Sequence, residues 1–122
     1  MIDISQINAK RVTLSDIKKD LDNEISRINN ACQPIEILVF GSFANNTATE
    51  ASDIDIAIIV PDNTDLRAIK QKFYSKARTS HWPFDILFIK QSDYNIKKVT
   101  GGVCFEINEN HIKLWSKDES TT

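Results

Sequence analysis

The stretch from Phe40 to Val60, FGSFANNTATEASDIDIAIIV, decides the fold of this chain. A mostly apolar run that begins at Ile35 ends abruptly at Gly41-Ser42, and after ten further residues come Asp53 and Asp55. Side chains alternate between the two faces of a strand, so these two aspartates point the same way. The residues after them are apolar on both faces, which is typical of a buried strand. The stretch therefore predicts two core strands, over 35–41 and 53–60, joined through a tight turn.

Two carboxylates at the start of a buried strand cost free energy unless a cation lies close to them. An Asp-x-Asp pair alone is common and usually solvated, but a third acid, Asp85, begins the strand predicted over 84–89. Three carboxylates that converge at one sheet edge would repel one another without metal ions. Their oxygens suit Mg²⁺, which binds through carboxylates and substrate phosphates. If Asp85 lies beside the first two acids, their convergence argues for a two-metal site.

The Gly41-Ser42 pair has two compatible interpretations. Residues 43–46 are expected to form a short helical turn whose backbone amides can bind phosphate oxygens. Gly41 would allow the phosphate to approach closely, and the Ser42 hydroxyl could donate to it. The plain alternative is a strand-to-helix turn in which Ser42 is the helix N-cap.

The combined pattern, G-S-x(10)-D-x-D followed by Asp85, resembles the nucleotidyltransferases of the DNA polymerase beta superfamily. More narrowly, it is similar to the minimal nucleotidyltransferases, single-domain proteins often encoded beside HEPN-domain toxins. The resemblance runs from about Ile35 to Trp115. It implies an α/β (α+β) fold with a mixed central sheet flanked by helices. It also implies nucleotide binding by Gly41 and Ser42, and catalysis and metal binding by Asp53, Asp55 and Asp85.

On this resemblance the substrate is ATP and the cofactor is Mg²⁺, with two ions. Asp85 is the best candidate to accept the proton of the attacking hydroxyl, and adenine is assigned only because the family favours it. One departure stands out: many members carry Arg-Gly where this chain has Asn45-Asn46. Asn46 can adopt the left-handed conformation of a glycine. The missing arginine leaves open how the outer phosphates are neutralised.

The remaining elements follow from apolar periodicity. We expect helices over 14–30, opened by a Thr13–Asp16 capping box, and over 64–79. A helical segment over 93–108, interrupted by Gly101-Gly102, precedes a last short strand at 111–115. The basic residues of the 64–79 helix are expected to form mainly a solvated face, and His81 and His111 to have structural or surface roles. The predicted organisation is an N-terminal arm (1–12), one domain (13–115) and a polar tail (116–122).

Composition narrows the function further. A net charge of −2 gives no electrostatic footprint for nucleic-acid binding. No apolar run reaches the length of a membrane span, and the first residues lack a signal pattern. Cys32 and Cys104 have no metal-like spacing. We therefore expect reduced thiols and a cytoplasmic location.

Three functions compete at this stage. The resemblance favours transfer of AMP to a partner protein, a tyrosine of a HEPN ribonuclease, which would make this chain an antitoxin. The second is a small-molecule nucleotidyltransferase of the aminoglycoside type, although those enzymes usually carry an extra helical domain. The third is a non-catalytic subunit that caps a HEPN partner. The joint presence of the Gly-Ser pair and three acids speaks against this third function, and the missing arginine keeps it open.

Overall fold

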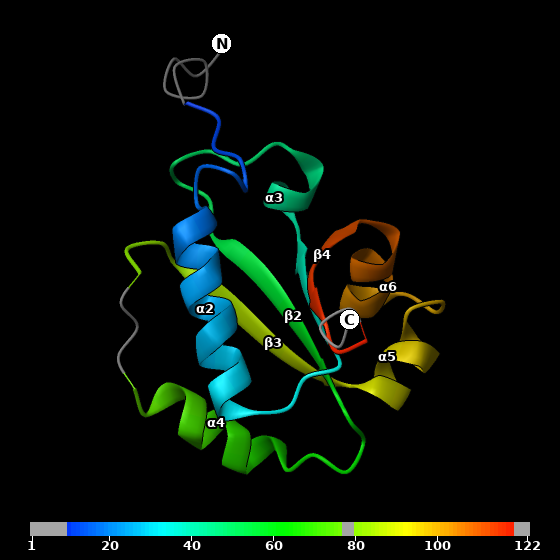
Figure 1. Ribbon diagram of the computed structural model, residues 1–122. Coiled ribbons are helices and arrows are strands. Elements are labelled where there is room, and N and C mark those ends of the chain that lie inside the picture. The colour runs from blue at the N-terminus through cyan, green and yellow to red at the C-terminus, as the bar shows by residue number, and fades with distance from the viewer. Residues whose placement is uncertain (1–9, 77–79, 119–122) are drawn as a thin grey trace.

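Four strands form one mixed sheet, in the order β3-β2-β1-β4, in the computed structural model, which describes residues 10–76 and 80–118 (Figure 1). β1 is antiparallel to both β2 and β4, whereas β2 and β3 run parallel. The fold is therefore the predicted α+β class with a mixed central sheet. The strands are β1 (Glu36–Phe40), β2 (Ile54–Val60), β3 (Phe84–Lys90) and β4 (His111–Ser116).

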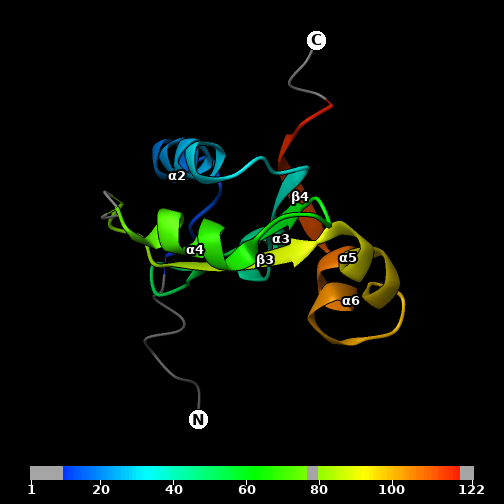
Figure 2. The same cartoon turned by 90° about the horizontal axis from the view of Figure 1, so that it is seen from below.

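The helices divide between the two faces of the sheet. α2 lies on one side and α5 and α6 on the other, as the view in Figure 2 shows, and α4 packs against α2. The short α3 follows β1 directly. The helices are α2 (Lys18–Ala31), α3 (Ser42–Asn45), α4 (Leu66–Tyr74), α5 (Gln91–Lys97) and α6 (Gly102–Glu109).

Each face of the sheet has its own apolar core. Ile54, Ile56 and Ile58 of β2 pack into the core on the α2 side, together with Ile28 and Phe73. The alternate residues of β2 enter the second core, which α5 and α6 cover with Tyr94, Cys104 and Ile107. Because β2 is buried on both faces, its sequence is apolar at nearly every position. This confirms the prediction of a buried strand.

The helix boundaries differ from the predicted ones. The capping box is present: the Thr13 amide donates to Asp16 Oδ2 at 2.8 Å, and the Asp16 amide donates to Thr13 Oγ1 at 3.3 Å. Hydrogen-bonded turns follow, and the α-helix itself begins only at Lys18. The helix predicted over 64–79 is shorter and is capped by Asp65, whose Oδ1 accepts from the Ala68 amide at 3.2 Å. Residues 77–79 of that prediction lie outside the described residues.

An ion pair within α2 includes an arginine that also binds the end of α4. Arg27 Nη1 donates to both carboxylate oxygens of Glu24, at 2.9 and 3.1 Å, and Glu24 is 2% exposed. Arg27 Nη2 donates to the backbone oxygens of Phe73 and Lys76, and its guanidinium lies 4.4 Å from the Phe73 ring centroid. Since the last carbonyls of a helix lack partners within it, Arg27 caps the end of α4 from α2.

The structure describes only part of the predicted N-terminal arm and of the predicted C-terminal tail. Residues 1–9 of the predicted arm and 119–122 of the predicted tail lie outside the described residues. Val12, by contrast, is buried and its amide donates to Ala48 O at 3.0 Å, while Ser116 pairs with Glu36 in the sheet. Both cysteines are free thiols. Within the described part of the chain, no helix combines the length and apolarity that crossing a membrane requires.

Candidate active site

The turn after β1 lies directly against an acid of β2. Gly41 has φ +70°, in the left-handed region that favours glycine. A β-carbon at this position would overlap Asp55 Oδ2 and lie 3.3 Å from Asp55 Cγ. The strand pairing explains this proximity, because Phe40, the residue before the glycine, is the partner of Asp55 in the sheet. The structure thus joins the Gly-Ser turn and the acidic strand into one site.

The single helical turn of α3 has the expected backbone. The amides of Ala44 and Asn45 donate to Gly41 O at 3.1 and 3.0 Å, and the Thr47 amide donates to Ser42 O at 2.9 Å. Asn46 has φ 61° and ends α3 in the left-handed conformation, which confirms the prediction for this residue. The alternative that Ser42 is the N-cap is wrong, because Gly41 occupies that position. The Ser42 hydroxyl is therefore not committed to capping the helix.

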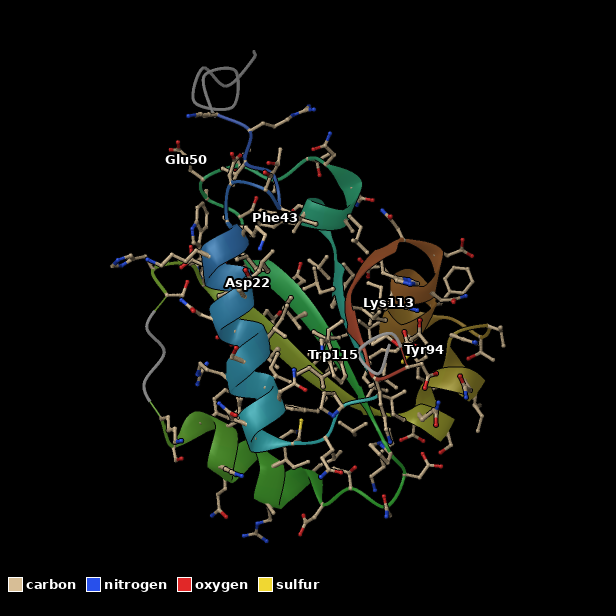
Figure 3. The ribbon with its side chains drawn as sticks, in the orientation of Figure 1. Asp22, Phe43, Glu50, Tyr94, Lys113 and Trp115 are labelled. Atoms are coloured by element: carbon tan, nitrogen blue, oxygen red, sulfur yellow. The ribbon has the colours of Figure 1, made fainter. Side chains whose placement is uncertain are left out.

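Aromatic packing positions α3 relative to the third acid. Phe43, which is labelled in Figure 3, is buried, and its ring meets that of Trp82 edge-on with centroids 6.4 Å apart. The Ile54 amide donates to Pro83 O at 2.8 Å, which aligns the starts of β2 and β3. Trp82 and Pro83 directly precede the strand that carries Asp85. This packing holds the Gly-Ser turn and the two acidic strand starts at the same end of the sheet.

The predicted acids form one electrostatic group. Asp55 pairs with Asp85 across the parallel β2–β3 ladder, so both carboxylates project from the same face. Asp55 is half-buried, whereas Asp53 and Asp85 are exposed. Burial raises the pKa of Asp55, and the negative charges of Asp85, Asp53 and Glu106 raise it further. The structure therefore places Asp55 in register with Asp85, and Asp53 near enough to influence the ionisation of Asp55.

The donor chemistry of this group suits a divalent cation. Carboxylate oxygens are the ligands that Mg²⁺ prefers, and a bound cation would offset the burial and the repulsion that raise the pKa of Asp55. Across residues 10–76 and 80–118, no three Asp, Glu, His or Cys side chains are already arranged as a metal site. The acids thus fit such an ion by their chemistry and placement, while their side chains are not gathered around one point.

Sequence reasoning missed one member of the site. Glu106, on α6, is close enough to influence the ionisation of Asp55, although nothing in its local sequence distinguishes it from a surface glutamate. His111 has the structural role expected of it, because its Nδ1 lies 2.7 Å from Ile107 O at the end of α6. The sequence does not predict that Glu106 and His111 lie near the acidic strands, because only the tertiary structure places α6 and β4 there.

The basic residues of α4 lie away from the site. Figure 1 shows α4 at the end of the sheet opposite to α3, and its Phe73 enters the core on the α2 side. Arg67, Lys70, Lys72 and Lys76 are exposed, and Arg78 lies outside the described residues. The expectation of a solvated basic face is confirmed for these four.

The model of the nucleotidyltransferase domain family matches residues 16–114, and the chain belongs to that family. The crystal structure of a candidate nucleotidyltransferase from Sulfolobus solfataricus is similar, with a TM-score of 0.57 and 16% identity over 95% of this chain and 87% of that one. At that identity the likeness shows the fold alone. Comparison with curated proteins finds no match.

Family membership confirms the prediction at its coarser level. This is a nucleotidyltransferase domain, and members of the family generally use a nucleoside triphosphate and a divalent metal. The acceptor, the base and the partner are not given by membership alone.

Proposed function

We propose that this chain transfers AMP from ATP, with Mg²⁺ bound, to a hydroxyl of a partner protein, a tyrosine of a HEPN ribonuclease, and so acts as an antitoxin. The observation that carries the proposal is the contact between the Gly41 turn and Asp55, with Asp85 in register beside it. In this proposal the turn binds the triphosphate, and the neighbouring acids bind its metal ions.

Each site residue has a role in this reaction. The triphosphate lies over Gly41 and Ser42, and Asp53, Asp55 and Asp85 would hold the divalent ions. Such ions stabilise charge on the attacking and leaving oxygens of an in-line displacement. The acceptor oxygen forms a bond to the α-phosphorus, the bond from that phosphorus to the bridging oxygen breaks, and pyrophosphate leaves. Asp85 accepts the hydroxyl proton.

The exposure of the site supports a macromolecular acceptor. Asp53 and Asp85 are exposed, so the acids lie at an open edge of the sheet that a partner surface could close. The α5–α6 hairpin, whose Glu106 influences Asp55, also presents exposed apolar side chains of the kind found at protein interfaces. These are Ile96, Val99, Val103 and Phe105. The net charge of −2 disfavours nucleic acid as the acceptor.

The test is intact-mass spectrometry of a HEPN protein encoded beside this chain, after co-expression with the wild type or with Asp53→Asn. We expect a mass increase of one or more AMP groups with the wild type and none with the variant. A control variant, Asp22→Asn, removes a carboxylate from the exposed face of α2 and should behave as the wild type. An inactive complex without any mass increase would support the capping-subunit alternative. Transfer to an aminoglycoside instead would support the small-molecule alternative.

A further inference from the structure

Position 45 holds an asparagine, so it offers no positive charge to neutralise the outer phosphates of a nucleotide. Asn45 is the last residue of α3, and α3 itself carries no charged side chain. The loop from Thr47 to Ser52 adds only Glu50. The described basic residues of α4 lie at the other end of the sheet (Figure 1). A positive group near the Gly-Ser turn must therefore come from another element.

Arg11 pairs with Thr49 of that loop, and the start of β4 is the element that the sheet register places beside the turn itself. His111 pairs with Phe40, and Phe40 pairs in turn with Asp55, which pairs with Asp85. Residues directly opposite one another in a sheet project from the same face, so His111 shares the face of the acids. Phe40 is followed by Gly41, and α3 contacts β4. His111 therefore lies beside the Gly-Ser turn, on the side away from Asp85.

One ring nitrogen of His111 is already committed. Its Nδ1 lies 2.7 Å from Ile107 O, and a carbonyl oxygen can only accept, so Nδ1 carries the proton. Ile107 is in the last turn of α6, where carbonyl groups lack a helical partner. This bond fixes the orientation of the ring. It leaves Nε2 as the remaining polar atom of a half-buried side chain at the site.

We propose that His111 is a triphosphate-binding residue, which donates a hydrogen bond from Nε2 to an outer phosphate and supplies the positive charge that Asn45 lacks. The inference rests on the proposed use of ATP. With Nδ1 already donating to Ile107 O, the ring donates from Nε2 only when both nitrogens are protonated.

The charged groups around this position are mostly acids. Asp55, Asp85 and Glu106 are the acids of the site, and Glu36 and Lys113 lie further along the same face. Lys113 pairs with Leu38, so it is two residues of β1 further from the turn than His111. His111 is thus the basic side chain of this face that the sheet register places nearest to Gly41.

Two substitutions separate phosphate binding from the capping of α6. In His111→Asn the side-chain amide can reproduce the donor at Nδ1 but does not extend to the position of Nε2. In His111→Gln the longer side chain places an amide near Nε2 and loses the short bond to Ile107 O. A role limited to capping predicts that Asn is tolerated and that Gln is the harmful change.

The experiment is calorimetric titration of ATP and of AMP, each with Mg²⁺, into the wild type and both variants, with the melting temperature of each protein. We expect His111→Asn to bind ATP about tenfold more weakly, as one lost charge-assisted hydrogen bond implies, with AMP affinity and melting temperature near those of the wild type. His111→Gln should melt lower but keep more of its ATP affinity.

The outcomes distinguish this inference from the proposed function. Equal ATP affinity in the wild type and His111→Asn overturns the assignment of His111 alone. An equal loss of ATP and AMP affinity also overturns it, because AMP lacks the outer phosphates. A wild type that binds no ATP overturns the proposed function itself, and the assignment of His111 with it.

Discussion

Gly41 and Asp55 lie so close together that a β-carbon on the glycine would overlap Oδ2 of the aspartate. Antiparallel pairing of Phe40 with Asp55 sets this distance, so the glycine and the acid belong to one structural unit. The contact makes glycine necessary for two independent reasons, a positive φ and a lack of space. It also gives a direct way to disturb the site without removing an ionisable group.

Gly41→Ala should abolish nucleotidyl transfer and lower stability. The left-handed backbone alone costs a non-glycine residue about 1 kcal/mol, and the overlap with Asp55 adds to that cost and displaces the carboxylate. Gly102→Ala is the matched control, because Gly102 has φ +76° but nothing within 4 Å of an added β-carbon. Chemical denaturation and a turnover assay measure both effects. Equal losses in the two variants would show that the contact with Asp55 is unimportant.

Asp55→Asn should stabilise the metal-free protein in a pH-dependent way. Because the pKa of Asp55 is raised above 3.8 in the folded state, the unfolded chain releases this proton more readily. The wild type therefore loses stability as pH rises from about 3.8 through the raised folded pKa, and the loss is constant above that range. Asp55→Asn removes this dependence.

The measurement is denaturant unfolding in the presence of a chelator, from pH 3.5 to neutral pH. The stability difference between Asp55→Asn and the wild type should grow across the acidic range and then level off. Asp22→Asn, which removes an exposed carboxylate on α2, should follow the wild-type curve. A constant difference at every pH would contradict the raised pKa of Asp55.

Divalent cations should stabilise the wild type through the same acids. A ligand that binds only the folded state at a hundred times its dissociation constant adds about 2.7 kcal/mol of stability. We expect Mg²⁺ to raise the melting temperature of the wild type, and to do so much less for Asp55→Asn or Asp85→Asn. Asp22→Asn should again respond as the wild type. An equal response in all four proteins would place the cation elsewhere.

Arg27→Met should destabilise the fold without changing the properties of the site. The substitution removes both hydrogen bonds from the buried Glu24 carboxylate, and breaking such a pair typically costs about 3 kcal/mol. Lys18→Met is the control on the same helix, because the Lys18–Asp22 pair is exposed and such pairs contribute less than about 1 kcal/mol. Denaturant unfolding measures both. A similar small loss in each variant would contradict a structural role for the Arg27–Glu24 pair.

The sequence alone determined those features that depend on neighbouring residues. The alternation of apolar side chains identified β2 as buried on both faces, because each face of that strand meets a separate core. The left-handed turn at Asn46 followed from the conformational preference of asparagine. The Gly-Ser pair and the three acids were predicted as one site, and Asp55 indeed lies against Gly41 and in register with Asp85.

Only the tertiary structure decided what else reaches that site. Glu106 influences Asp55 because α6 returns to the acids' face of the sheet, and His111 lies in register with Phe40, the residue before the Gly-Ser turn, because β4 pairs with β1. The basic residues of α4 are kept away because Phe73 packs into the opposite core. Strand order and helix placement arise from contacts between residues distant in sequence. For that reason no local pattern could place Glu106 and His111 at this end of the sheet, or α4 at the other end.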